Sequence, residues 1–282
     1  MNLRLRFPIA ACLLLLTASF FPAILGLATA VEDKFNPSCL PFAAIATHHQ
    51  VDRDCPSQGI PESLAQKKQN IAKNALCALN PAVIVNLGVF DALQQAVEQK
   101  HIPFGNQHIH NPVTLSSNRA QLRKLVKDAD GADVGEGTKV VFVGFLVPKE
   151  HSPGAESVNC NQPHKENNDI HFDLGESSTS DICTTITAEI IPHYRPTAWG
   201  EITSTVIQGR LQTVPMRITG HMFFDASHAP CNHPRHDSKD PKRRSEWEIH
   251  PVYAIDVCKP GAACRAGVDS DWIAFDRWIA QP

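Results

Sequence analysis

The sequence predicts an α+β fold, in which a small helical region precedes a larger set of antiparallel strands. Two patterns support this prediction. Apolar residues recur at helical spacing before residue 128, and they alternate with polar residues after residue 138. The composition also allows a packed core, because 43% of the 282 residues are hydrophobic and 20% are charged. Wholesale disorder is therefore excluded.

The N-terminus has the order of parts of a secretory signal peptide over residues 1–30. Arg4 and Arg6 precede a long apolar stretch, which ends in the small residues Ala28 and Ala30 that signal peptidase requires. The alternative is a retained transmembrane anchor, since the stretch is long enough to span a bilayer. Cleavage after Ala30 predicts a secreted or periplasmic protein with no remaining membrane span.

The cysteine content agrees with export. Of the nine cysteines, Cys12 lies in the signal peptide, and an even set of eight in an exported chain indicates a disulfide framework. Three of them precede residue 128 and five follow it, so complete pairing requires at least one bridge between the two halves. Cys258 and Cys264 are close enough to pair with each other. The eight candidates are Cys39, Cys55, Cys77, Cys160, Cys183, Cys231, Cys258 and Cys264.

Residues 31–127 are predicted to be a helical, cysteine-containing N-terminal region. Its first thirty residues have no period and indicate a loop held by disulfides. The predicted elements after this loop are a helix over 62–80, a strand or helix start at 83–85, a helix over 90–100, and a helix capped by Ser117. Residues 128–138 are acidic and rich in glycine, which is typical of a linker or a long turn.

Residues 139–282 form the second predicted domain. Alternation predicts strands over 139–147, 169–174, 184–191, 214–225 and 247–258, with a weakly helical segment over 196–211. This order resembles the OB-fold, a five-stranded Greek-key barrel with a helix between its third and fourth strands. The resemblance implies an OB-like antiparallel β-barrel followed by a C-terminal tail.

Four phrases in this domain resemble those of a group of uncharacterised exported bacterial proteins. The phrases are NDIHFDL (168–174), TAEIIPHYRP (187–196), RITGHMFFDASH (217–228) and SEWEIHPVYAIDVC (245–258). This resemblance supports the barrel fold, and it implies no activity.

One face of the predicted strands is rich in acidic and histidine side chains, because alternate residues of a strand point to the same side. The catalytic candidates on this face are Asp169, His171, Asp173, Glu189 and His250. If the strands pair in a suitable register, these side chains would bind a divalent transition metal or serve as acid and base. The interpretation that the sequence favours is a solvated barrel exterior. The sequence His250-Pro251 further predicts that its strand lies at an edge or is bulged.

A second histidine cluster lies between the fourth and fifth predicted strands, where an OB barrel places a ligand-binding loop. Its candidate metal ligands are His221, His228, His233 and His236. Cys231 is expected to be oxidised, so its sulfur is not available as a thiolate ligand. Flanking lysines and arginines favour an ordinary mobile, solvated loop over a selected metal site.

The sequence contains no GxSxG, P-loop or HExxH motif, and it leaves open whether the protein is an enzyme. Residues 139–282 carry 14 basic and 18 acidic residues, which disfavours a nucleic-acid partner. The favoured interpretation is a disulfide-stabilised binding module for a peptide, a glycan or another envelope protein.

The alternative function is a metal-dependent hydrolase, which includes a nuclease in which Asp169, Asp173 and Glu189 surround a divalent cation. The two functions differ in one geometric requirement. A hydrolase requires the candidate side chains to meet at a concave surface, whereas a binding module does not. The 14 histidines also predict a change of charge under mildly acidic conditions.

Overall fold

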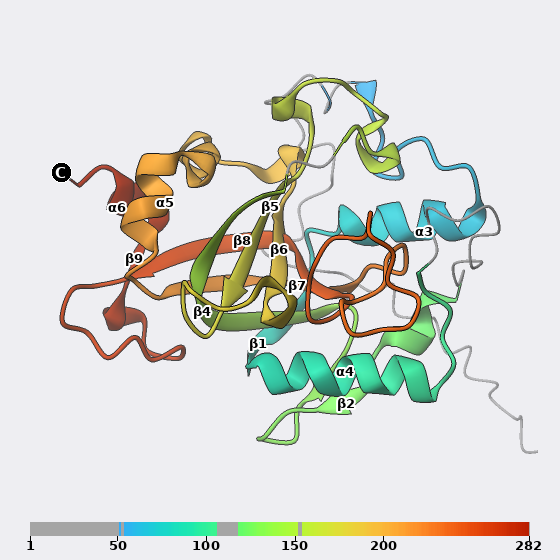
Figure 1. Ribbon diagram of the computed structural model, residues 1–282, viewed down its shortest axis with the longest axis horizontal. Coiled ribbons are helices and arrows are strands. Elements are labelled where there is room, and N and C mark those ends of the chain that lie inside the picture. Colours follow the sequence, from blue (N-terminus) through green and yellow to red (C-terminus); the bar gives the residue numbers. More distant parts are fainter. Residues whose placement is uncertain (1–50, 52–53, 106–117, 152–153, 282) are drawn as a thin grey trace, which may run out of the picture. The chain divides into compact units, whose positions relative to one another are not determined.

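The structure is a computed structural model that describes residue 51 and residues 54–105, 118–151 and 154–281 (Figure 1). These residues belong to one compact unit. The predicted signal peptide, most of the predicted N-terminal loop and Cys39 lie outside the described residues. Within the described part of the chain, no helix is long and apolar enough to cross a membrane.

Five strands close into a barrel, which confirms the α+β class. The strands are β4 (Thr138–His151), β5 (Ile170–Gly175), β6 (Ile186–Ile190), β7 (Met216–Phe224) and β8 (Trp247–Cys258). Around the barrel the order is β4, β5, β6, β8 and β7, and β7 pairs with β4 to close it. The barrel is mixed rather than wholly antiparallel as predicted, because β6 and β8 run parallel where Ala188 lies beside Ile249.

Two further strands extend the sheet beyond the barrel. β1 (Leu79–Val85) pairs in parallel with β4, and β9 (Trp272–Ala274) pairs antiparallel with β8 (Figure 1). Of the two alternatives predicted for residues 83–85, a strand or a helix start, the structure has the strand. Because β1 adds to the same sheet as the barrel strands, the N-terminal half contributes directly to the barrel.

The third predicted helix is wrong within the described residues. A 3-10 turn at Arg119–Leu122 is followed instead by a small hairpin, in which residues 128–132 make the turn between the two strands and residues 135–137 lead into β4. An ion pair between Arg119 and the buried Glu136 holds the turn in place. The strands of this hairpin are β2 (Val126–Lys127) and β3 (Asp133–Val134).

The first two helices begin at side-chain caps, and the second buries an apolar face. Ser63 Oγ accepts a hydrogen bond from the Gln66 N–H at the start of the first helix, which ends at Lys73 rather than extending to residue 80. In the next helix, Phe90 and Leu93 are completely buried in the barrel core. The helices are α3 (Leu64–Lys73), α4 (Leu87–Gln99), α5 (Thr205–Leu211) and α6 (Phe275–Ile279). Further 3-10 turns lie at Ser157–Asn159, Lys165–Asn167, Ile182–Thr184, Pro192–Tyr194, Thr197–Thr203 and Asp269–Asp271.

Strand alternation sorts the side chains as predicted, but the polar face is not solvated. Ile170, Phe172 and Leu174 of β5 lie in the apolar core, whereas His171 and Asp173 line a pocket on the opposite face. The polar side chains of this face are largely buried, with exposed fractions of 0–6% at Asp169, Asp173, Glu189, Glu248 and His250. The expected solvated exterior is therefore wrong.

The cover over this face comes from α3 and from the loop between β7 and β8, here called the β7–β8 loop (residues 225–246). These two segments lie next to each other in Figure 1, and Gln69 of α3 donates hydrogen bonds to Asp225 and Ser227. The β7–β8 loop was expected to be solvated and mobile. Instead its Asp240 and Arg243 are only 6% and 1% exposed.

Disulfides connect segments that are distant in sequence. Cys55–Cys160 bridges the two halves of the chain, and Cys183–Cys231 ties the β7–β8 loop to the 3-10 turn before β6. The Cys258–Cys264 pair that the sequence predicts is also present. Cys77 is disulfide-bonded as well. These bonds confirm the predicted framework for the described cysteines.

The strand containing Pro251 is bulged, and it does not lie at an edge. β8 pairs with β6 on one side and with β7 on the other. Its register with β7 shifts on both sides of Gly220, so that two residues of β8 oppose one residue of β7. Gly220 is required here, because a Cβ atom at this position would lie 2.6 Å from the Pro251 carbonyl oxygen.

Candidate metal centre

Three adjacent barrel strands bring acidic and histidine side chains together in what we call the acid–histidine cluster. His171 of β5 lies directly opposite Glu189 of β6, and the parallel pairing of β6 with β8 places His250 beside them. The cluster comprises Asp169, His171, Glu189, Glu248 and His250. Four of the five predicted catalytic candidates therefore meet in space.

Glu189 occupies the centre of this cluster. Its Oε2 atom lies 2.7 Å from His250 Nδ1 and 3.1 Å from His171 Nε2. His250 Nε2 lies 3.7 Å from Asp169 Oδ2, and Glu248 Oε2 lies 3.9 Å from His250 Nδ1. Two sets of potential ligand atoms, each within 4.8 Å of one another, share Glu189: Asp169 with His171, and Glu248 with His250.

Several atoms of the cluster contact each other without forming a hydrogen bond of normal geometry. Among the described residues, this is true of Asp169 Oδ2, Glu189 Oε2, Glu248 Oε2 and both ring nitrogens of His250. Buried polar atoms normally have a hydrogen-bond partner, and leaving one without costs about 1–3 kcal/mol. Lone pairs of carboxylates and imidazoles that converge in this way can bind a cation.

The charge state of the cluster is set by burial and by Glu189. Burial alone lowers the pKa of a histidine, but the surrounding carboxyl groups, Glu189 foremost among them, together outweigh it and raise the pKa of His171 to about 9 and that of His250 to about 10. Burial would raise the pKa of Glu189, but the two imidazolium rings and Lys73 hold it well below its usual value. Both rings therefore carry protons at neutral pH when no ion is bound, and a metal ion must displace those protons.

The pKa of Glu248 is shifted in the opposite direction to that of Glu189. Burial raises its pKa to about 8, and the neighbouring charge of Glu189 acts in the same direction. The Arg243 guanidinium opposes these effects, with Nη1 lying 3.1 Å from Glu248 Oε1. Glu248 is consequently protonated more readily than Glu189.

His221 contacts the backbone of the cluster rather than its potential ligand atoms. Its Nδ1–H donates a 2.7 Å hydrogen bond to the backbone carbonyl of His250, at the bulge opposite Gly220. Complete burial lowers the pKa of His221 to about 3, so this ring is neutral. His221 thus holds the backbone of His250 in place, and it is not part of either ligand set.

A small pocket opens onto the acid–histidine cluster, with a volume of about 50 Å³. His171 and Glu189 reach its surface, whereas Glu248 and His250 lie behind it. The lining includes three lysine or arginine side chains and four carboxylates. The lining residues are Lys73, Glu156, His171, Asp173, Thr187, Glu189, Asp225, His228, Pro241, Lys242 and Arg243.

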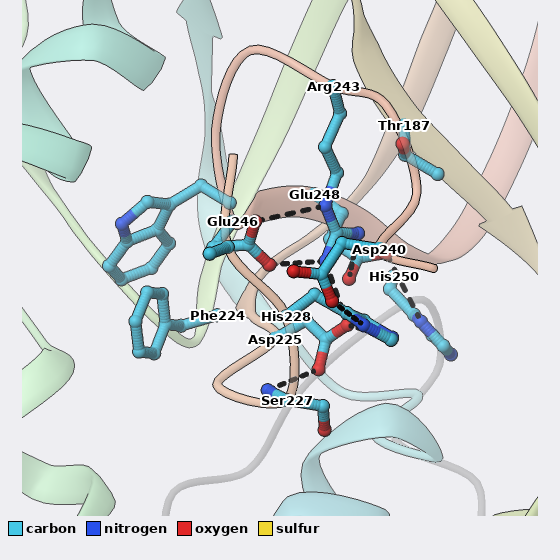
Figure 2. Close-up of polar contacts among 12 residues, drawn as sticks. Thr187, Phe224, Asp225, Ser227, His228, Asp240, Arg243, Glu246, Glu248 and His250 are labelled. Atoms are coloured by element: carbon cyan, nitrogen blue, oxygen red, sulfur yellow. Dashed lines mark hydrogen bonds and ion pairs between the residues drawn. The ribbon is translucent and has the colours of Figure 1, made fainter. Parts of the chain in front are cut away.

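Arg243 organises the wall of this pocket, and the sequence analysis missed its role. Its guanidinium binds Asp225 at 2.9 Å, Glu248 at 3.1 Å, and Glu246 (Figure 2). Burial lowers the pKa of Arg243, but the three carboxylates outweigh it and raise the pKa well above its usual value. A basic run in a loop is usually solvated, so nothing local in the sequence indicates that this residue of the run is buried.

The four histidines predicted as a second metal site do not meet in one ligand set within the described residues. Each ring has its own contact. His228 Nδ1 lies 3.0 Å from Asp240 Oδ1, and the His233 ring packs on Phe104 with centroids 4.9 Å apart. The His236 Nδ1–H donates to the Ala229 carbonyl at 2.8 Å. His221 contacts His250, as described above.

Of the remaining predicted residues, Asp173 lies beside the cluster and accepts a 3.1 Å hydrogen bond from Thr187. It lines the pocket but belongs to neither ligand set. Glu248 alternates with His250 on the predicted polar face, so the period of the strand was the signal that could have added it to the candidates. Lys73 and Glu156, which form a 3.0 Å ion pair at the pocket, carried no comparable signal.

No protein-family model, no curated protein and no solved structure matches this chain.

Proposed function

We propose that this protein is a divalent-metal-dependent hydrolase that acts on a small anionic ester. The observation that carries the proposal is the convergence of Asp169, His171 and Glu189, with the potential ligand atoms within 4.8 Å of one another, next to a pocket that His171 and Glu189 line. This is the geometric requirement that distinguishes a hydrolase from a binding module.

The three ligands suit zinc and similar ions. One imidazole and two carboxylates are donors that such ions accept, and three protein ligands leave a coordination position open for water. A bound divalent ion lowers the pKa of that water and so supplies a nucleophile at neutral pH. His171 is the most exposed member of the cluster and lies at the pocket surface, so the open position would face the substrate.

The charge of the pocket supports an anionic substrate. Three lysine or arginine side chains line it, and a divalent ion that replaces the proton on His171 would add a further positive charge. These charges would favour binding of an anion. A volume of about 50 Å³ admits a single phosphate-sized group. The excess of acidic residues over residues 139–282 disfavours a long nucleic acid.

We also propose that the barrel is OB-like. The order of the strands, with α5 between the third and fourth barrel strands, supports it. OB barrels bind ligands on their second and third strands and at the loop between the fourth and fifth. Here β5, β6 and the β7–β8 loop line the pocket.

Export to an oxidising compartment is proposed on the strength of the disulfides, which persist in such compartments. Binding of a peptide, a glycan or another envelope protein stays a prediction of the sequence. The described residues offer no surface whose chemistry selects one of these partners.

The test is Zn²⁺ binding by titration calorimetry, together with hydrolysis of methyl p-nitrophenyl phosphate. We expect one Zn²⁺ per chain in this site and zinc-dependent hydrolysis. His171→Ala and Glu189→Gln should each weaken binding at least tenfold. His101→Asn, which removes an exposed imidazole, serves as the matched control. Equal zinc binding by wild type and both site variants would overturn the metal site, and zinc binding without hydrolysis would overturn the enzyme.

A further inference from the structure

His228 lines the same pocket as the acid–histidine cluster but comes from the β7–β8 loop rather than from the strands. Its Nδ1 atom lies 3.0 Å from Asp240 Oδ1 (Figure 2). The Asp240 side chain is only 1% exposed, whereas that of His228 is 20% exposed. The pair thus has a buried carboxylate behind a ring that reaches the pocket.

The carboxylate of this pair is itself held in position. Asp240 Oδ2 accepts a 2.9 Å hydrogen bond from the Asp237 N–H, and the Asp240 N–H donates to the Asp237 carbonyl, also at 2.9 Å. Because Asp240 Oδ1 accepts a hydrogen bond from Nδ1–H, the other ring nitrogen of His228 is the one that can exchange a proton with a bound molecule. That Nε2 atom lies 3.7 Å from Asp225 Oδ2.

The loop that carries the pair is anchored to the rest of the barrel at several points. The Cys183–Cys231 disulfide holds one part, and two hydrogen bonds from Arg244 to Asp91, at 2.5 and 2.6 Å, hold its end. The buried Arg243 of the same loop lines the pocket. His228 is therefore presented to the pocket by an ordered segment, which a proton-transfer residue requires.

We infer that His228 is the general acid of the reaction and that Asp240 is its positioning residue; this inference rests on the proposed function. In the hydrolysis of a phosphate diester, a water oxygen forms a bond to phosphorus and gives one proton to solvent. The bond from phosphorus to the leaving oxygen breaks, and its electron pair stays on that oxygen. The proton on His228 Nε2 passes to the leaving oxygen, and the neutral ring regains a proton from solvent.

If His228 had only a structural role, the kinetic effect of losing it would differ from the effect of losing a general acid. The His228–Asp240 contact also closes a loop, so its loss could disturb the pocket without any part in the chemistry. The two roles differ in how they depend on the leaving group. A general acid matters most when the leaving oxygen is a strong base, whereas a disturbed pocket slows all esters alike.

The experiment compares methyl phenyl phosphate with methyl p-nitrophenyl phosphate, using the zinc-loaded full chain. Phenolate is a stronger base and a poor leaving group unless it is protonated. p-Nitrophenolate is a weaker base and leaves without protonation. We expect His228→Ala to reduce kcat/KM for the phenyl ester by about 10²–10⁴-fold and that for the p-nitrophenyl ester by less than about tenfold. Asp240→Asn should show the same selectivity with a smaller loss.

His236→Asn is the matched control, because His236 lies on the same loop outside the pocket and makes its ring contact with a backbone carbonyl. It should leave both rates unchanged. Zinc binding by calorimetry should be the same in all four proteins.

The outcomes separate the two proposals. Equal losses on both esters, with zinc binding intact, would overturn the acid role while leaving the hydrolase in place. If His228→Ala slows the hydrolysis of neither ester, the acid role is also overturned and the hydrolase stays in place. If the zinc-loaded wild type hydrolyses neither ester, the proposed function fails and the acid role fails with it.

Discussion

Glu189 Oε2 lies 2.7 Å from His250 Nδ1, in the interior of the chain, where both side chains are at most 2% exposed. Glu189 is also the residue that the two possible ligand sets share. A carboxylate between two protonated imidazoles is a stable arrangement without a metal. It becomes a ligand when a divalent ion displaces the protons. The cluster therefore contributes to folding and can also bind a metal.

His250→Ala should destabilise the metal-free protein by about 3–5 kcal/mol, because removing one partner leaves buried carboxylates without their counter-charge. Asp169, 3.7 Å from His250 Nε2, would lose the same partner. Urea unfolding at pH 7 measures the change. His236→Asn should cost less than about 1 kcal/mol. Similar losses for the two variants would show that the cluster contributes nothing special to stability.

Arg243→Met should also cost about 3–5 kcal/mol, since it strands three buried carboxylates. Arg243→Lys should recover only a small part of this loss, because one ammonium cannot replace the fork of a guanidinium that contacts Asp225, Glu246 and Glu248 together. Guanidinium unfolding curves provide the measurement. The adjacent, exposed Lys242→Met is the control, and a loss there equal to that of Arg243→Met would contradict the assignment.

His221 should make the protein less stable in acid. Its pKa is about 3 in the folded chain and near 6.5 when unfolded, so the unfolded state binds more protons between these values. Its contribution to stability is complete above pH 6.5 and is lost as the pH falls toward 3, by up to about 1.4 kcal/mol per pH unit. Subtracting the pH profile of His221→Asn from that of wild type isolates this effect. Parallel profiles would rule it out.

Gly220→Ala should destabilise the barrel by about 1–3 kcal/mol, because the added Cβ would lie 2.4 Å from Ile249 Cγ2 and 2.6 Å from the Pro251 carbonyl. Gly209→Ala is the matched substitution in α5, where no atom lies within 4 Å of the new Cβ. It should stabilise the protein by about 0.5–1 kcal/mol. Thermal unfolding of the two variants should shift in opposite directions, and shifts of the same sign would contradict this account.

The barrel strands could be predicted because alternation is a local property. Ile170, Phe172 and Leu174 point to the core for the same reason that His171 and Asp173 point away from it. The helix expected after Ser117 shows the limit of local pattern, since an ion pair between Arg119 and Glu136 holds a 3-10 turn there instead.

The sequence by itself therefore determined the α+β class, the strands and the face on which acidic and histidine residues gather. Only the tertiary structure decided that Glu189 and His250 touch, because that contact depends on the parallel register of β6 with β8. It also decided that the face is covered and that Arg243 is buried. Each of these depends on segments distant in sequence, whose pairing is set by the packing of the whole chain rather than by any local pattern.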